Sequence, residues 1–276
     1  MEIELLNKQD EEVVSYFVRQ KKGLLDTYLD KKYLNDHLNS PRSFIRRMKE
    51  DGVLRSIQWG RYIVTSKENP QKNPLYHSFE VLPKLLLERL GMEYYVSWHS
   101  ALWYYGLLDQ QSGTITAAIT GRKVNYESET IGVRFVSLSK GKFFGYTERS
   151  ISGHRINMAV PEKALIDSFA HPDLSAPYSV IVNSLREAAQ DKLISGKKFA
   201  KMCLRMESPA LNRRIGFWME RYEIDGYQEL LPHLGHKYAV SLAPGPYEKT
   251  ETATKVNRKW KVLEDIQIIY TVEHMK

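Results

Sequence analysis

Residues 40–64 read SPRSFIRRMKEDGVLRSIQWGRYIV, and this stretch decides the fold of the first part of the chain. Ser40 is followed by a proline, and this pair suits the N-cap and the first turn of a helix. Phe44, Ile45 and Met48 then recur at i, i+1 and i+4, which predicts an apolar stripe along one side of that helix. The stretch therefore begins with an amphipathic helix.

The other side of this helix is polar and basic. It carries Arg42, Ser43, Arg46 and Arg47. Gly52 then ends the helix, because glycine adopts the left-handed conformation of a helix cap without strain. Two strand-like runs follow at residues 53–57 and 61–64, separated by a glycine-containing turn at 58–60. An arginine-faced helix followed by a small hairpin predicts a winged helix-turn-helix.

Two further helices are expected ahead of this stretch. Residues 10–19 have acidic residues in the first turn and an apolar face, and Gly23 ends this helix. The expected buried face is Val13, Val14, Phe17 and Val18. A short connection then leads to a second helix at residues 30–38. Its expected inward residues are Leu29, Tyr33, Leu34 and Leu38.

The domain organisation follows from a change in composition after the hairpin. Residues 66–77 hold two prolines and no periodicity, which is typical of a linker. We therefore predict a winged-helix domain at 1–65 and a larger mixed α/β domain at 78–276, an α+β fold overall. In the larger domain, helices are expected at 79–90, 99–105, 162–169, within 178–206 with a break near 195–196, and at 210–222. Strands are expected at 114–119, 133–136, 155–159, 238–242 and 259–268.

Composition and charge restrict the function classes. The chain has 276 residues, a net charge of +7 and one cysteine, so no disulfide framework or thiolate metal cluster is expected. No apolar run is long enough to span a bilayer, and the first residues are acidic rather than signal-like. We expect a cytoplasmic protein with no membrane partner. Residues 40–64 contain six basic and two acidic residues, and 242–262 form a second cationic stretch. This charge is compatible with a polyanionic partner.

Double-stranded DNA is the partner that this pattern favours. Helix-turn-helix proteins read base edges with the first turns of the second helix and contact phosphates with flanking cations. The residues expected to enter the major groove are Arg42, Ser43, Arg46 and Arg47. The expected phosphate contacts are Lys49, Arg55 and Arg61. The alternative is a winged helix that serves protein assembly only, and it predicts no salt-dependent binding of DNA.

Enzyme signatures are largely missing from the sequence. There is no phosphate loop, dinucleotide fingerprint or H-E-x-x-H pattern, so no catalytic residue, metal or cofactor is expected. Glu162 and Asp167 resemble part of a metal-dependent nuclease site, although Glu162 also suits a helix N-terminus and Asp167 an exposed helical position. His233 and His236 could chelate a metal, but more simply they are solvated.

An aromatic cluster lies in the second domain. It consists of Trp98, Trp103, Tyr104 and Tyr105. Such residues could stack on bases, although aromatic clusters on a helix more often form core.

Several segments of the second domain resemble the AbiEi-type abortive-infection antitoxins. Residues 94–110 read YYVSWHSALWYYGLLDQ, a GRK turn lies at 121–123, and 134–146 read RFVSLSKGKFFGY. Residues 158–169 read MAVPEKALIDSF, where this family typically shows a Pro-Glu-Lys-Ala-Leu-hydrophobic-Asp run. Residues 240–262 resemble the family's Leu-x-Pro and Arg-x-Trp region. The segments occur in the family's order, behind a winged helix.

The resemblance implies a DNA-binding antitoxin of a type IV toxin–antitoxin system. Such a protein represses its own operon by binding operator repeats, and its neighbour is a nucleotidyltransferase-like toxin. The second domain would support antitoxicity, without a stable complex with the toxin. How antitoxicity works, by repression, by substrate competition or by modification of the toxin, is left open by the residues.

Overall fold

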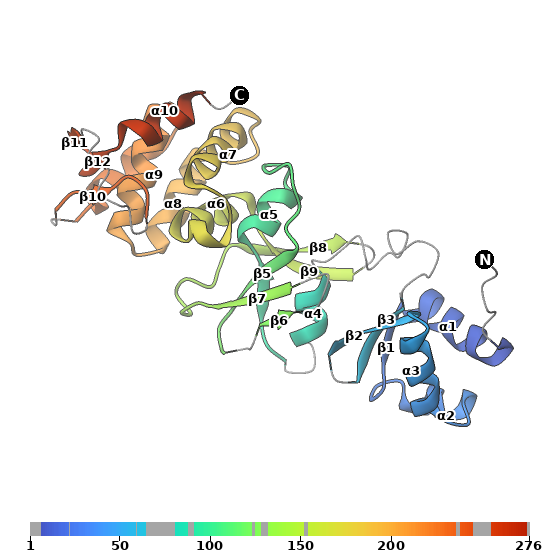
Figure 1. The fold of residues 1–276 in the computed structure, drawn as a ribbon. Coiled ribbons are helices and arrows are strands. Elements are labelled where there is room, and N and C mark those ends of the chain that lie inside the picture. The colour runs from blue at the N-terminus through green and yellow to red at the C-terminus, as the bar shows by residue number, and fades with distance from the viewer. Residues whose placement is uncertain are drawn as a thin grey trace. The chain divides into compact units, whose positions relative to one another are not determined.

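The chain divides into two compact units (Figure 1). The first comprises Met1–Arg89 with Ser150–His154, and the second comprises Leu90–Arg149 with Arg155–Lys276. This computed structural model describes residues 7–21, 23–58, 60–64, 81–87, 91–122, 125–127, 132–151, 154–235, 238–244 and 255–274. The predicted linker, 66–77, lies outside the described residues, as do the domain boundaries predicted on either side of it.

The first unit alternates helices with short strands. Its elements are α1 (Lys8–Lys21), β1 (Leu24–Asp26), α2 (Lys31–His37), α3 (Pro41–Glu50), β2 (Leu54–Gln58), β3 (Arg61–Val64) and α4 (Val81–Leu87). The strands form an antiparallel sheet in the order β1-β3-β2. The helix expected at 41–51 and the two strands after it are confirmed. Strand β1 was not predicted, because three residues are too few to show a period of two.

Helix α3 begins and ends at the residues that carry its sequence signals. The Oγ of Ser40 accepts a hydrogen bond from the amide of Ser43 (3.4 Å), as an N-cap does. At the other end, Gly52 has a φ of 68°. The next amide, that of Val53, donates to the carbonyl of Met48 (2.8 Å), which is the 6→1 bond of a Schellman motif. Local chemistry thus fixes both ends of the helix.

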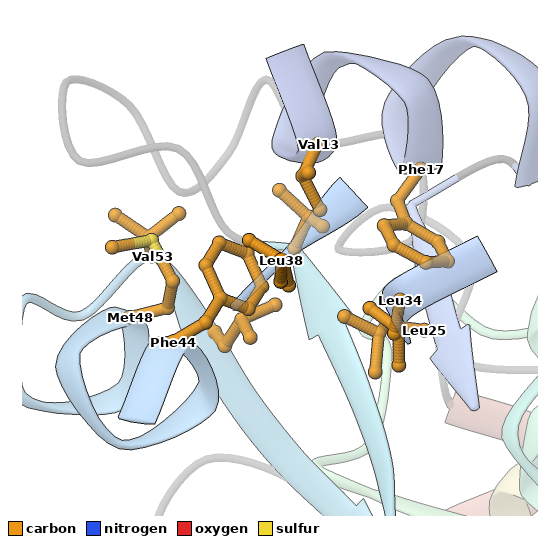
Figure 2. Close-up of a cluster of buried hydrophobic side chains, with 10 residues drawn as sticks. Val13, Phe17, Leu25, Leu34, Leu38, Phe44, Met48 and Val53 are labelled. Carbon is orange, nitrogen blue, oxygen red and sulfur yellow. The ribbon is translucent and has the colours of Figure 1, made fainter. Parts of the chain in front are cut away.

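The core of the first unit lies between its helices and its sheet (Figure 2). The buried residues come from α1, β1, α2, α3 and the strands that follow. They are Val13, Phe17, Leu25, Leu34, Leu38, Phe44, Met48, Val53, Leu54 and Val64. Phe44 and Met48 supply the buried side of α3, so the predicted stripe is confirmed, with Ile45 partly buried beside it. This packing turns the opposite side of α3 outward.

Two residues predicted to be buried in this unit are exposed. Val18 is 46% exposed, because the buried face of α1 is the narrow pair Val13 and Phe17, and Val18 lies about a quarter turn further round the helix. Leu29 is 65% exposed, because it lies in the turn before α2 and helical periodicity does not apply there. These two predictions were wrong.

The second unit contains a mixed six-stranded sheet. Its strands are β4 (Tyr94–Val96), β5 (Thr114–Ile119), β6 (Tyr126–Glu127), β7 (Gly132–Ser137), β8 (Tyr146–Ile151) and β9 (His154–Ala159). The order is β6-β7-β5-β4-β9-β8, with β5–β7 and β4–β9 parallel and β4–β5 antiparallel. The strands predicted near 114–119, 133–136 and 155–159 correspond to β5, β7 and β9.

Helices make up most of the remaining part of the second unit (Figure 1). They are α5 (Trp98–Tyr104), α6 (Pro161–Ala170), α7 (Tyr178–Gln190), α8 (Gly196–Arg205), α9 (Pro209–Arg221) and α10 (Ile266–His274), with 3-10 turns at Pro172–Leu174 and Tyr227–His233. A small sheet of β10 (Val240–Ser241), β12 (Val262–Glu264) and β11 (Lys255–Asn257) lies in this unit. Trp98, Trp218 and Trp260 are its largest fully buried side chains.

Two elements of the second unit differ from the prediction. Tyr94–Val96 is a strand that was not predicted, since a short central strand that is buried on both faces shows no alternation of apolar and polar residues. The strand expected at 259–268 is β12 followed by α10. The Oδ1 of Asp265 accepts from the amide of Gln267 (2.9 Å), which caps a helix at this point.

The predicted fold class, a mixture of α and β structure, is confirmed. Within the described part of the chain, no helix combines the length and the apolar composition needed to cross a membrane.

Candidate nucleic-acid interface

The outer face of α3 carries three exposed cations, Arg42, Arg46 and Lys49. Their spacing of four and three residues places them on one side of the helix, opposite the buried Phe44 and Met48. No carboxylate pairs with any of the three among the described residues. These three predicted residues therefore lie together on one side of the helix, and none of them is paired with a carboxylate among the described residues. We call them the α3 cation face.

Two grooves flank this face. The first, of about 530 Å³, lies between α3 and the β2–β3 hairpin, and its lining includes Arg42, Arg46, Lys49, Gly60 and Tyr62. The second, of about 630 Å³, lies between α2 and α3. Its lining includes Tyr28, Lys31, Asn35, Asn39, Ser40 and Arg42. Arg42 lines both grooves, so the first turn of α3 is the point where they meet.

Ser43 lies beside this meeting point, half-buried in the first turn of α3. Its hydroxyl accepts a hydrogen bond from that of Ser40 (3.0 Å), and its amide is the one capped by the same Ser40 oxygen. Ser43 therefore takes part in the N-terminal cap as well as lying next to the α3 cation face.

Arg47 does not share the α3 cation face. Its Nη2 donates to Asp10 of α1 at 2.7 Å, and the Asp10 side chain is almost fully buried. Asn7 binds the same carboxylate through its side-chain amide (2.8 Å), so Asp10 is anchored from two directions. The predicted base contact of Arg47 does not fit this placement, because its guanidinium is engaged by Asp10. Arg47 holds α3 against α1 instead.

Arg61 is fully buried, with 0% of its surface exposed. Its Nε donates to the Oδ2 of Asp26 (2.7 Å), and the two residues are cross-strand partners in β3 and β1. Asp26 also accepts hydrogen bonds from the amides of Tyr28 (2.9 Å) and Leu29 (3.1 Å), which shapes the turn before α2. A guanidinium without exposed surface cannot reach a phosphate, so the structure contradicts the predicted role of Arg61.

Arg55 lies half-buried on β2, opposite Ile63 of β3. Its contact with phosphate stays a prediction.

Sequence reasoning missed three residues of the groove between α2 and α3. Tyr28 is 78% exposed, and it lines this groove together with Lys31 and Asn35. Tyr28 lies in the turn that Asp26 shapes, so its placement depends on the Asp26–Arg61 pair rather than on any periodic pattern. An Asp two residues before an aromatic residue is the local signal of such a turn, and on its own it is weak.

The carboxylates considered for a nuclease are engaged with separate lysines. Lys163 Nζ donates to Asp167, which also accepts from Ser97 Oγ (2.8 Å) and Tyr95 OH (3.2 Å). Glu162 is buried and pairs with Lys198 (3.1 Å). Burial lowers the pKa of Lys163 and raises that of Asp167, while the contact between the two groups opposes both shifts. The idea that Asp167 is an exposed helical residue was wrong, since it is fully buried.

The other candidates of the second unit are mostly structural. Trp98 is fully buried in the core, and Tyr105 donates its hydroxyl to the carbonyl of Ala159 (2.8 Å), whereas Tyr104 is exposed. His233 is exposed, and His236 lies outside the described residues. Among the described residues, no three His, Cys, Asp or Glu side chains cluster in a way that could hold a metal ion.

Comparison with known proteins shows the fold of the chain. No family model matches this chain, and no curated protein matches it. Among solved structures, it is similar to the crystal structure of the RV2827C protein from Mycobacterium tuberculosis, with a TM-score of 0.71 and 15% sequence identity. The similarity covers 98% of this chain and 96% of that protein. At this level of identity the two chains share a fold, and function has to be argued from the residues of the site.

Proposed function

We propose that this protein is a sequence-specific DNA-binding repressor of the AbiEi type, which acts as the antitoxin to a nucleotidyltransferase-like toxin. The observation that carries the proposal is the α3 cation face. Three unpaired cations project from a helix that is capped at both ends and packed on its apolar side. Helix-turn-helix proteins present their recognition helix to the major groove in this manner.

The order of elements in the first unit supports a winged helix-turn-helix. A helix, a short strand, two helices and a hairpin follow one another from α1 to β3. In this proposal α3 is the recognition helix and the β2–β3 hairpin is the wing. Arg42, Ser43 and Arg46 enter the major groove, while Lys49 and Arg55 contact the phosphates beside it.

The two charged residues that do not contact DNA hold the recognition helix and the wing in place. Arg47 ties α3 to α1 through Asp10, and Arg61 ties the wing to the turn before α2 through Asp26. In this proposal Arg47 and Arg61 set the geometry of the contact, and other residues touch the DNA.

Footprinting on the DNA upstream of the chain's own gene tests the repressor part. Full-length protein should protect a short region that contains inverted repeats, because a dimeric helix-turn-helix protein matches a two-fold operator. Failure to protect any site, at low salt and high protein concentration, would contradict the proposal and leave a protein-docking role for the two grooves.

Co-expression tests the antitoxin part. The chain and the neighbouring toxin are placed under separate inducible promoters, so that repression cannot explain rescue. We expect growth to be restored by the wild-type chain and by the Arg42→Ala/Arg46→Ala variant alike, since antitoxicity is assigned to the second unit. A toxin that stays lethal in the presence of the wild-type chain would contradict this assignment.

A further inference from the structure

The second unit carries a basic surface on α8. Lys198, Lys201 and Arg205 follow one another at i, i+3 and i+7, which places them along one side of the helix. The opposite side packs into the core through Phe199 and Cys203, both fully buried. Helix α8 reads GKKFAKMCLR and has no acidic residue. The outer side of α8 therefore carries cations and no carboxylate of its own.

The loop after β7 adds a further cation to this surface, Lys142, and is fixed against the helix. Gly145 in this loop has a φ of 74°, and a Cβ built on it would lie 2.5 Å from the Cε of Met202 of α8. The guanidinium of Arg205 lies over the ring of Phe144, 4.0 Å from its centroid. These contacts pack the loop directly against α8.

Cations of the loop and of the helix act on the same buried group, Lys163, and most of them lack a carboxylate partner in the described part of the chain. Burial lowers the pKa of Lys163, Asp167 raises it, and the positive charges of Lys142 and Arg205 lower it again. Lys198 is neutralised by Glu162, but Lys142, Lys201 and Arg205 have no carboxylate partner among the described residues. We call these three residues the α8 cation face.

We propose that the α8 cation face binds the phosphate backbone of nucleic acid, independently of base sequence. An ordinary solvated helix face mixes acidic and basic residues, whereas α8 has no acidic residue of its own. From Lys201 to Arg205 the helix rises by about 6 Å, which corresponds to about two phosphates along one strand of a duplex. The Arg205 guanidinium lies over the ring of Phe144, and arginine can bind a phosphate with two N–H donors at once.

This surface lies in the second unit and is independent of the α3 cation face. Its test therefore uses the full chain in which Arg42→Ala and Arg46→Ala remove DNA binding by the α3 cation face. In that background we compare Lys142→Gln/Lys201→Gln/Arg205→Gln with a matched triple, Arg122→Gln/Arg134→Gln/Lys255→Gln. The matched triple removes the same charge from exposed positions elsewhere in the second unit. The probes are a fluorescent duplex DNA of scrambled sequence and a single-stranded RNA, titrated from about 50 to 200 mM salt.

The α8 triple should lose at least tenfold in affinity at low salt, and its slope of log affinity against log salt should fall by roughly 2 to 3 on the duplex. The matched triple should change neither quantity by a comparable amount. A loss on both probes assigns the site to nucleic acid in general, and a loss on RNA alone assigns it to RNA. Equal behaviour of the two triples on both probes would overturn the proposal, as would a loss confined to an acidic polypeptide such as polyglutamate.

A second variant distinguishes a loss of nucleic-acid binding from a loss of folding. Lys142→Gln/Lys201→Gln leaves the packing of Arg205 on Phe144 in place. It should show a smaller part of the same change in slope, with an unchanged melting temperature. If this double variant binds like the parent and only the Arg205 change has an effect, accompanied by loss of stability, the proposal is wrong.

Discussion

The guanidinium of Arg61 and the carboxylate of Asp26 form a buried ion pair, with Nε 2.7 Å from Oδ2, and both side chains are almost entirely out of solvent. The pair joins the hairpin of the first unit to the turn that carries Tyr28. Arg61, which the sequence pattern predicts to contact phosphate, therefore has a structural role.

Removing either partner of the Arg61–Asp26 pair should strongly lower the stability of the first unit. Arg61→Ala and Asp26→Ala are each expected to cost about 3–5 kcal/mol of unfolding free energy, because the remaining charge is left buried. Chemical denaturation followed by circular dichroism measures this. The exposed Arg46→Ala is the control and should stay within about 0.5 kcal/mol of the wild type. Similar stability of Arg61→Ala and Arg46→Ala would contradict the buried role.

Arg47 should affect DNA binding only through Asp10. Arg47→Ala and Asp10→Ala are each expected to cost about 1–3 kcal/mol of stability, since each breaks the same partly buried pair. Both should weaken operator binding to a similar degree, and the double variant should be no weaker than the single ones. A double-mutant cycle checks this. Additive losses would mean that Arg47 contacts DNA by itself.

Salt dependence separates the cations that contact phosphate from those that do not. Lys49→Ala should reduce the slope of log affinity against log salt by about 1, on the operator and on scrambled duplex alike. Arg47→Ala should leave this slope unchanged, because its charge is already matched by Asp10. Anisotropy titrations at several salt concentrations give both slopes. An equal fall for the two variants would contradict the distinction.

Gly145 should not tolerate a side chain. Gly145→Ala places a methyl group 2.5 Å from Met202 Cε and 3.0 Å from Lys163 Cβ, at a φ of 74° that only glycine adopts without strain. We expect a loss of about 1–3 kcal/mol of stability in the second unit. Gly113→Ala is the matched control, because a Cβ there meets nothing within 4 Å. Equal melting temperatures for the two variants would show that the loop is not fixed against α8.

Cys203 should be unreactive until the second unit unfolds. Its side chain is fully buried, and burial raises the pKa of the thiol, so little thiolate forms near neutral pH. Ellman's reagent should therefore label the native protein slowly and the denatured protein at once. Rapid labelling under native conditions would mean that α8 opens easily, which would also weaken the case for a rigid cation face on its surface.

The sequence was sufficient for elements whose signals are local. Ser40 and Gly52 fix both ends of α3, and Phe44 and Met48 give the side that packs inward. The exposed cations follow from the same pattern, since arginine and lysine on the other side of a packed helix face solvent. The α3 cation face was therefore predictable, apart from Arg47.

The roles of Arg47 and Arg61 were not predictable from the sequence. Arginine is rarely buried unless it is paired, and the partner of Arg61 lies 35 residues away in a three-residue strand. Asp10 is likewise distant in sequence from Arg47, by 37 residues. In the second unit, the i, i+4 spacing of Lys163 and Asp167 can be read from the sequence. Their hydrogen-bonded surroundings cannot, because Tyr95 and Ser97 lie about 70 residues away in the chain.

The central claim is that the α3 cation face reads DNA sequence, and the ratio of affinities for operator and scrambled duplex tests it most directly. The wild-type chain should prefer its operator by about 10³-fold or more. Arg42→Ala/Arg46→Ala should lower this ratio by about thirtyfold or more, because each of the two base contacts contributes about 1–3 kcal/mol of discrimination. The control, Lys8→Ala/Arg19→Ala, removes two exposed cations from α1 and should keep the wild-type ratio. A double variant of α3 that keeps the wild-type ratio would contradict the account.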